Sequence, residues 1–133
     1  MEKKLIRVRD IMRTHFEFVD RKETVRSALA KMEKTNARAL IVDKRNEDDE
    51  YGIVVLADIA KLVLAVDKSP DRVNVYEIMS KPVIHVSPEM DIRFCARLFE
   101  RFGLERAPVV SGGKVVGMVS YHVLVLRGLS QLL

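Results

Sequence analysis

The chain has 133 residues, of which 48% are hydrophobic and 32% charged, a composition that excludes a disordered protein. No apolar run reaches the roughly 18 residues of a membrane span. The N-terminal stretch "MEKKLIRVRD" lacks the apolar core of a signal peptide, so we expect a cytoplasmic protein without membrane contact. The net charge of +4 is too evenly spread to indicate nucleic acid binding, although a mild positive field suits a phosphate-bearing ligand.

The first predicted element is a short extended segment over residues 15–19. A helix follows, because apolar residues recur on one face at helical spacing, namely Val25, Ala28, Leu29 and Met32. Asp20, with Glu23 three residues later, has the spacing of a capping box, in which each side chain satisfies a backbone N–H at the helix start. The pattern predicts that this helix begins just after Asp20.

Two apolar strands come next, residues 38–43 and 51–56, and a polar, acidic loop joins them. We expect the side chains of this loop to extend into solvent, because extra residues in a surface loop cost little free energy. The segment "GIVVLADIA" at 52–60 then leads from the second strand into a helix that begins near Ala57.

The same elements are predicted again in the second half. An extended segment covers residues 83–86, and Ser87–Pro88 resembles a helix start, since proline suits a first-turn position that needs no donor. The apolar face of that helix comprises Ile92, Cys95, Ala96 and Phe99. Strands 106–110 and 114–120 are joined by "SGGK", which predicts a tight hairpin because glycine tolerates positive φ. A last helix begins near Tyr121.

The two halves are an internal repeat. "VRDIM" at 8–12 returns as "VYEIM" at 75–79, an offset of 67 residues, and these two stretches are termed the lead segments below. The duplication predicts an α/β (α+β) fold of two β-α-β-β-α repeats. We assign the first repeat, with the N-terminal lead segment, to residues 1–67 and the second to residues 68–133, and we expect the two to form one module.

Enzymatic chemistry has little support in the sequence. The histidines, His15, His85 and His122, are scattered, and none has a Cys, Asp or His partner at metal-ligand spacing. The single cysteine, Cys95, excludes a disulfide framework, and its place on an apolar helix face indicates a core residue rather than a nucleophile. "SGGK" lacks the length and the following helix of a phosphate-binding loop. We therefore expect no enzyme, no metal and no resident cofactor.

The chain resembles the tandem cystathionine β-synthase (CBS) domain pair, also called a Bateman module, from Val8 to about Leu129. The resemblance rests on "VRDIM" and "VYEIM", on the "ALIVD" and "APVV" strands, and above all on "GIVVLADIA". That segment is similar to the family's glycine, two branched residues, Ser or Thr, two variable residues, Asp and an apolar residue. The resemblance implies a stand-alone CBS protein whose two repeats are related by a pseudo-twofold axis, with sheets inside and helices flanking.

In this family the paired repeats enclose two clefts that can hold an adenosine-containing nucleotide, such as AMP, ADP, ATP or S-adenosylmethionine. The resemblance implies that in the first cleft Asp58 accepts hydrogen bonds from ribose, Arg38 contacts phosphate and Ile53 flanks adenine. Val55 stands where the family usually has Ser or Thr, and losing that hydroxyl should cost about 0.5 to 1.5 kcal/mol of binding free energy. The partner repeat would close this cleft with Lys81, Pro82, Val83, Ile84, Leu104 and Glu105.

The second cleft is expected to be degenerate. Val123 stands where the family has the acid and cannot accept a hydrogen bond from ribose, although Ser120 keeps the family's hydroxyl. Glu105 stands in the place of Arg38 and would repel a phosphate. We assign Arg13 and Thr14 to this second cleft.

The residues assigned to the first cleft also have ordinary structural explanations. An aspartate early in a helix, such as Asp58, is common as a cap and is favoured by the helix dipole. Arg38 is equally consistent with a solvated residue at the start of a strand, and a branched strand residue such as Ile53 is a core residue by default.

Two functions of different classes therefore remain open. The first is a regulatory module that binds nucleotide and acts in trans on an unidentified protein. The second is a structural domain for self-association, with both clefts degenerate. The last helix of each half is apolar on more than one face, and such a helix should be buried on both sides. We expect a homodimer that covers Ile59, Leu62, Val63, Leu64, Val66, Val123, Leu124, Val125 and Leu126.

Overall fold

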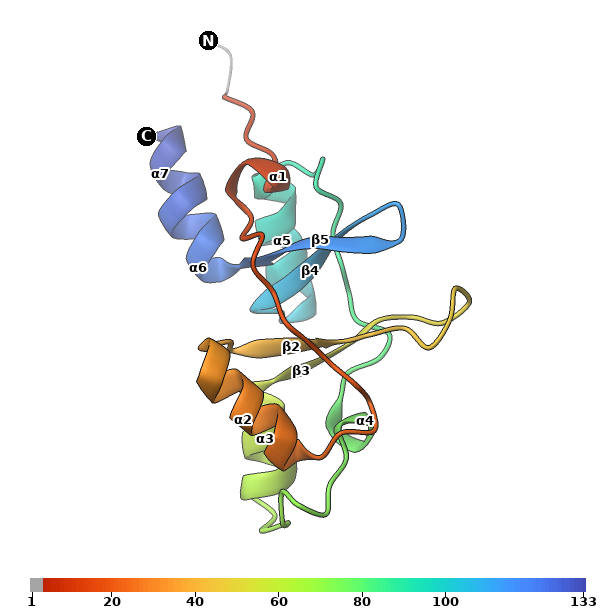
Figure 1. The fold of residues 1–133 in the computed structure, drawn as a ribbon. Helices are drawn as coiled ribbons and strands as arrows, with labels where there is room; N and C mark the ends of the chain where they lie inside the picture. The colour runs from red at the N-terminus through yellow and green to blue at the C-terminus, as the bar shows by residue number, and fades with distance from the viewer. Residues whose placement is uncertain (1–3) are drawn as a thin grey trace. The chain divides into compact units, whose positions relative to one another are not determined.

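The computed structural model describes residues 4–133 and divides into two compact units (Figure 1). The central unit comprises residues 16–83, and the terminal unit comprises residues 84–133 together with the N-terminal residues up to His15. These units differ from the sequence halves 1–67 and 68–133, because each unit contains the lead segment of the other half. No helix among residues 4–133 has the length and hydropathy of a membrane span.

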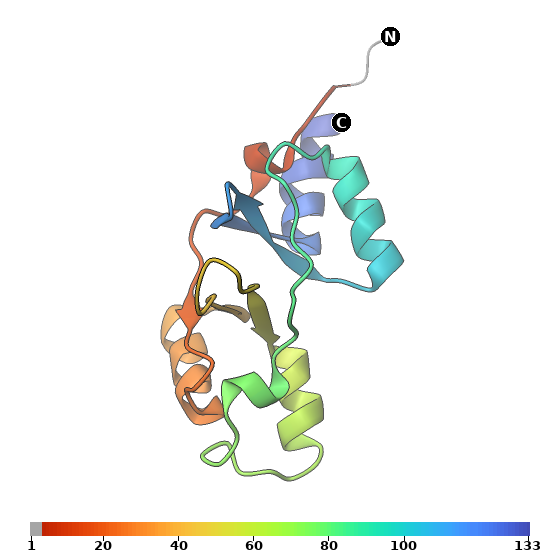
Figure 2. The same cartoon turned by 90° about the vertical axis from the view of Figure 1, so that its right-hand side faces the viewer.

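The central unit packs two helices against one face of a three-stranded sheet (Figure 2). Strand β1 pairs in parallel with β2, and β2 pairs in antiparallel fashion with β3. Helix α3 continues directly into a π-helix, η1. The elements are β1 (Phe18–Val19), α2 (Val25–Thr35), β2 (Ala39–Val42), β3 (Gly52–Val55), α3 (Leu56–Ile59), η1 (Ala60–Leu64) and α4 (Val75–Ile78).

The terminal unit repeats this arrangement around an antiparallel pair of strands, β4 and β5. Gly112 and Gly113 form the hairpin with φ of 59° and 77°, as "SGGK" predicts, because positive φ is open mainly to glycine. The last helix again contains a π-helical stretch, η2. The elements are α1 (Val8–Ile11), α5 (Ile92–Phe102), β4 (Arg106–Ser111), β5 (Lys114–Ser120), α6 (Tyr121–Val123), η2 (Leu124–Leu129) and α7 (Ser130–Leu132).

The pairing register confirms the predicted duplication. Val42 pairs with Gly52 in the central unit, and Val109 pairs with Gly117 in the terminal unit. A parallel neighbour contacts each valine on its other side, Val19 in β1 or Val86 in the terminal unit. The two units are therefore two copies of one β-α-β-β-α arrangement.

Each lead segment ends by pairing with the last strand of the unit that contains it. Ser80 and Ile53 exchange two backbone hydrogen bonds of 2.9 Å, and Arg13 and Met118 exchange two of 2.9 and 2.8 Å. Ser80 follows the second lead segment but pairs with a strand of the first half of the chain. Arg13 follows the first lead segment but pairs with a strand of the second half. This exchange explains why the packing units differ from the sequence halves.

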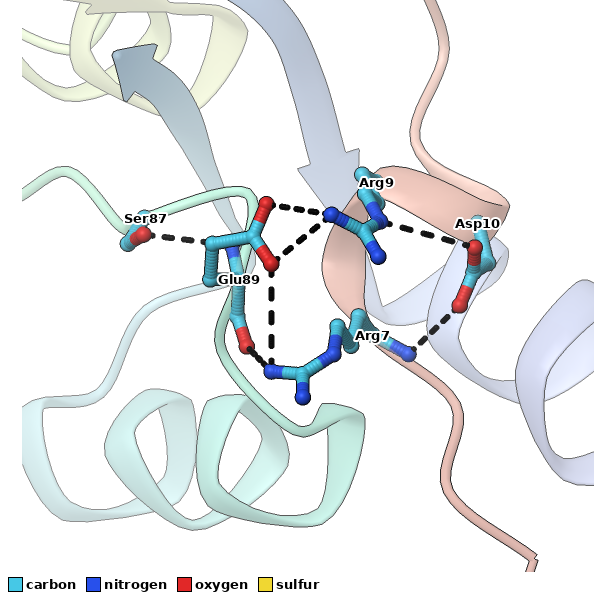
Figure 3. A network of polar contacts seen from close by, with 5 residues as sticks. All are labelled: Arg7, Arg9, Asp10, Ser87 and Glu89. Atoms are coloured by element: carbon cyan, nitrogen blue, oxygen red, sulfur yellow. Dashed lines mark hydrogen bonds and ion pairs between the residues drawn. The ribbon is translucent and has the colours of Figure 1, made fainter. Parts of the chain in front are cut away.

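The first lead segment is also held by charged side chains (Figure 3). Arg9 Nη1 donates to both carboxylate oxygens of Glu89 at 2.6 and 2.8 Å, and Arg7 Nη1 donates to the Glu89 carbonyl oxygen at 2.7 Å. Exposed ion pairs of this kind contribute little net stability, usually about 0 to 1 kcal/mol. Their main effect is to fix the orientation of the first lead segment against the residues that precede α5.

Both predicted helix starts are wrong by several residues. The N-cap of α2 is Thr24, whose hydroxyl accepts a hydrogen bond from the Ser27 amide at 3.1 Å. Asp20 instead accepts from the amide of Lys22 at 2.8 Å, in a turn that precedes the helix. The predicted capping box between Asp20 and Glu23 is therefore not formed at the start of α2.

The start of α5 differs from its prediction in the same way. Asp91 is the N-cap and accepts from the Arg93 amide at 2.8 Å, while the Ser87 hydroxyl accepts from the Glu89 amide at 3.1 Å in a turn. Aspartate and serine stabilise turns and caps through the same local hydrogen bonds, so residue type alone does not separate the two.

Each unit has its own apolar core between its sheet and its helices. The predicted helix faces are confirmed, with the most deeply buried positions at Val25, Ala28, Cys95 and Phe99. Cys95 lies in the terminal core, and burial raises the pKa of its thiol to about 11. A thiol that stays protonated at neutral pH is a poor nucleophile, so Cys95 acts as a core residue.

Candidate ligand-binding site

Asp58 lies in the first turn of α3, where it is half-buried. It is the third residue of the helix and not the N-cap, because the N-cap position is occupied by Val55, which makes no side-chain capping bond. Within residues 4–133, the Asp58 carboxylate makes no hydrogen bond or ion pair. The helix dipole favours a negative charge in this turn. The Asp58 carboxylate is thus an acceptor without a hydrogen-bond partner among the described residues.

Arg38 lies at the same edge of the sheet as Asp58. Its carbonyl oxygen accepts a hydrogen bond from the Leu56 amide at 3.4 Å, two residues before Asp58. The register pairs Ala39, the first residue of β2, with Val55, the last residue of β3. The Arg38 side chain is exposed and has no partner among the described residues, so a free guanidinium and a free carboxylate flank the start of α3.

Ile53 and Val55 lie on the sheet face opposite to the helices. Val54 belongs to the core beneath α2 and α3, and side chains alternate along a strand, so its two neighbours point the other way. Ile53 is buried and Val55 is half-buried. Val55 therefore contributes an accessible apolar side chain at this end of β3, whereas the side chain of Ile53 is covered.

Residues 81–83 run along the other edge of β3. The Val83 amide donates to the Tyr51 carbonyl oxygen at 2.9 Å, and Ser80 pairs with Ile53. Lys81 does not point freely into solvent, because its ammonium Nζ lies 2.8 and 2.9 Å from the two carboxylate oxygens of Asp49. The central unit thus contains Arg38, Ile53, Val55, Asp58, Lys81, Pro82 and Val83, and the terminal unit contains Ile84, Leu104 and Glu105.

Asp49 was missed by the sequence analysis, which placed the side chains of its loop in solvent. The side chain of Asp49 is only 7% exposed. Besides Lys81, it accepts hydrogen bonds from the backbone amide and the Nε of Arg45, at 2.9 and 3.1 Å. The donation from Lys81 and Arg45 holds the pKa of Asp49 well below its usual range. Nothing in the loop sequence "KRNEDDEY" distinguishes Asp49 from its acidic neighbours.

The equivalent position in the terminal unit has a different chemistry. Ser120 is the N-cap of α6, and its hydroxyl accepts from the Val123 amide at 3.3 Å. Val123 is 1% exposed and lies in the terminal core. Arg13 and Thr14 are exposed, and the Arg13 backbone pairs with Met118. Here the hydroxyl is engaged in capping and the acid is replaced by a core residue.

The described residues contain no group of three or more His, Cys, Asp or Glu side chains that could hold a metal ion. The start of α3 offers the carboxylate of Asp58 as an acceptor, the guanidinium of Arg38 as a donor and the half-buried apolar side chain of Val55. Such a set can bind a polar ligand with an apolar part.

The chain belongs to the CBS domain family, which it matches over residues 8–65 and 75–126. The two matched segments make it a tandem CBS pair, or Bateman module, as the repeats predict. The fold of the two units agrees with this assignment, because solved CBS pairs superimpose on the chain over nearly its whole length.

Several proteins are similar to this chain. The hexameric CBS-CP12 protein of bloom-forming cyanobacteria is 35% identical, covers 93% of this chain and 72% of its own, and has a TM-score of 0.91. A conserved CBS domain protein of unknown function from Thermoplasma acidophilum is 29% identical over 97% of this chain and 75% of its own, with a TM-score of 0.83. An uncharacterized protein of Methanopyrus kandleri is 33% identical over 60% of this chain, and the match spans 41% of that relative.

Proposed function

We propose that this CBS pair is a regulatory module that binds an adenosine-containing nucleotide at the central unit and acts in trans on a partner protein. The proposal is carried by two groups without partners among the described residues, the carboxylate of Asp58 and the guanidinium of Arg38, whose backbone accepts a hydrogen bond from Leu56 two residues before Asp58. A carboxylate accepts two hydrogen bonds from a vicinal diol such as ribose, and guanidinium can hold two phosphate oxygens. The half-buried Val55 offers an apolar contact for the base, on the same sheet face as the buried Ile53.

The Asp58 assignment is tested by calorimetry with adenosine, AMP, ADP, ATP and S-adenosylmethionine. Asp58→Ala removes a charged acceptor, so we expect a loss of about 1.5 to 3 kcal/mol, or roughly 10- to 150-fold in affinity. Asp48→Ala is the matched control, because Asp48 is an exposed carboxylate of the same unit whose side chain contacts no described residue. Equal affinities for the wild type and Asp58→Ala would remove the site.

We expect about one bound nucleotide per chain. In the terminal unit the Ser120 hydroxyl caps the helix and Val123 is buried, so a ribose would find no carboxylate acceptor at that helix start. Val123→Ala is a poor control for binding, because truncating a core residue leaves a cavity and lowers stability. A stoichiometry of two in the calorimetric titration would contradict a degenerate second cleft.

The alternative function, self-association without a ligand, is favoured by a different observation. The helical stretches α3–η1 and α6–η2 expose large apolar side chains that their own cores do not cover. Of the residues predicted at a dimer contact, Ile59, Val63, Val123 and Leu124 are buried within their units. The exposed ones are Leu62, Leu64, Val66, Val125 and Leu126. The hexameric state of the CBS-CP12 relative supports assembly for this chain as well.

The two functions are separated by a thermal-shift measurement. A ligand at 100 times its dissociation constant adds about 2.7 kcal/mol to the free energy of unfolding, which is readily seen as a raised melting temperature. No shift with any adenine nucleotide would leave self-association as the function.

A further inference from the structure

Helix α5 carries a row of apolar side chains that its own unit leaves exposed. Phe94 is 60% exposed and Phe102 is 55% exposed, and the half-buried Leu98 lies between them in the sequence. The three residues are spaced by four, so they follow one side of the helix, and they are termed the α5 row below. The Arg97 guanidinium lies 5.3 Å from the centroid of the Phe94 ring. Aromatic residues and arginine are enriched at contacts between proteins.

Helix α2 provides an internal comparison, because the two helices match residue by residue. Each has 11 residues and ends at a cap in the left-handed region, Asn36 or Gly103. The α5 row corresponds in α2 to Ser27, Lys31 and Thr35. Helix α2, all of which the structure describes, exposes no large apolar side chain. The fold of a repeat therefore does not require the α5 row, and exposed apolar surface of this kind usually marks a contact with another molecule.

The neighbouring helical stretch of the terminal unit exposes apolar side chains as well. Ile92 and Phe99 of α5 share one core with Val123 and Leu124, so α5 and α6–η2 pack side by side (Figure 2). The exposed large apolar residues of η2 are Val125, Leu126 and Leu129. Both helices that cover the terminal sheet thus expose apolar residues, whereas of the two that cover the central sheet only α3–η1 does.

The charges on α5 favour a second copy of the chain as the molecule that covers this row. A twofold contact brings one surface against itself, so the surface must be complementary to its own copy. An antiparallel pair of α5 helices can place Phe94 opposite Phe102 of the second copy. In that register Arg97 is within one residue, about 1.5 Å along the axis, of the level of Glu100 in the second copy. Opposite charges then meet beside the apolar row, whereas α2 has Ala30 in the place of Arg97.

We propose that α5 packs antiparallel against α5 of a second copy, so that the terminal units of two chains contact each other across a twofold axis. Nucleotide binding is not needed for this contact. The other arrangement, terminal unit against central unit, would set the α5 row against Ser27, Lys31 and Thr35 of α2. Two apolar rows that cover each other remove more apolar surface from water than one apolar row against a polar one.

The test is disulfide formation between added cysteines, in chains that keep the buried Cys95. The double variant Phe94→Cys/Phe102→Cys should form a covalent dimer under mild oxidation, because each new cysteine lies opposite the other one of the second copy. Neither single variant should cross-link, since its two copies are then eight residues, or roughly 12 Å, apart along the helix axis. A disulfide needs Cα atoms about 4.4 to 6.8 Å apart. Gel electrophoresis without reductant measures the covalent dimer.

The matched control is the double variant Phe102→Cys/Ser27→Cys, because Ser27 is exposed and stands on α2 in the place of Phe94. This pair lies face to face only where a terminal unit meets a central unit, so the control should not cross-link. A covalent dimer of the control, a covalent dimer of either single variant, or none from Phe94→Cys/Phe102→Cys overturns the inference.

Sedimentation provides a second measurement that needs no cross-link. Phe94→Glu places a charge in the contact, and we expect it to weaken association about 10- to 100-fold, as for a central apolar residue of an interface. Ser27→Glu adds the same charge at the matching position of α2 and should leave association nearly unchanged. Circular dichroism verifies that both variants are folded. A monomeric wild type, or equal effects of the two substitutions, overturns the inference.

Discussion

Val55 and Ser120 occupy the same place in the two repeats, directly before a helix, and only Ser120 caps that helix. By the family resemblance, the hydroxyl missing at position 55 is a lost ligand contact. In the structure it is also a lost cap, because the amide of Asp58 has no side-chain acceptor at Val55. The effect of a hydroxyl at position 55 on the stability of the helix can therefore be measured separately from its effect on ligand binding.

We predict that Val55→Thr raises the free energy of unfolding by about 1 kcal/mol, because its hydroxyl can accept from the Asp58 amide as Ser120 accepts from Val123. The reverse change, Ser120→Val, should lower it by a similar amount. Urea denaturation of the ligand-free proteins checks both. If nucleotide affinity also rises in Val55→Thr, the hydroxyl serves the ligand as well as the helix.

Cys95 makes stability depend on alkaline pH. Burial raises the pKa of its thiol to about 11, above the value of about 8.5 in an unfolded chain. A raised folded-state pKa means that the contribution is complete below about pH 8.5 and is lost as the pH rises towards about 11. We predict that stability falls less steeply over this window in Cys95→Ala than in the wild type, as measured by denaturation at several pH values. Parallel curves would contradict the prediction.

At the scale of elements, Gly52 at the start of β3 and Gly117 within β5 each permit the close approach of a lead segment. A Cβ at Gly117 would lie 2.7 Å from Met12 Sδ and 2.8 Å from the Arg13 carbonyl oxygen. At Gly52 the nearest atoms, Met79 Sδ and the Ser80 carbonyl oxygen, would both be 3.2 Å away. The Arg13 carbonyl oxygen accepts the hydrogen bond from the Met118 amide, so it cannot move away without breaking that pairing.

We therefore predict that Gly117→Ala lowers the free energy of unfolding by about 1 to 3 kcal/mol, the usual cost of overpacking, and that Gly52→Ala costs less. Chemical denaturation of the two variants under identical conditions gives the comparison. Equal effects, or a larger effect at Gly52, would contradict this ranking.

Periodicity and glycine placement predicted the elements of both repeats, because each depends on residues close in sequence. The helix faces around Val25 and Cys95 and the hairpin at Gly112–Gly113 are of this kind. The helix starts were misplaced, since Asp20 and Ser87 form turns with the hydrogen bonds that a cap would make. Local patterns separate such alternatives poorly.

Contacts between distant segments were not predictable from the residues. The pairing of Ser80 with Ile53 exchanges the lead segments between halves, and no residue type marks it. The burial of Asp49 follows from that exchange, because Lys81 reaches the loop only once Ser80 is paired with β3. The prediction of Asp58 rests on a family motif, and its lack of a partner among the described residues is visible only in the structure.

At the scale of the whole molecule, the exchange makes each compact unit depend on both halves of the chain. The terminal unit needs the N-terminal lead segment, and the central unit needs residues 75–83. The apolar surfaces of α3–η1 in the central unit and α6–η2 in the terminal unit are not covered by their own units. Leu64 is 77% exposed and Leu126 is 60% exposed, and large exposed apolar patches usually mark contacts with other molecules.

We predict that the chain is a homodimer whose contact includes Leu64 and Leu126, because a closed twofold arrangement covers the same residues on both copies. Replacing both leucines with Glu places charges in that contact, and sedimentation at micromolar concentration should then show a monomer. Tyr76→Glu is the matched control, since Tyr76 is also exposed but lies on α4. Far-ultraviolet circular dichroism verifies that each variant is folded. A wild type that sediments as a monomer, or a double variant that stays associated while folded, would show that these two leucines do not form the contact.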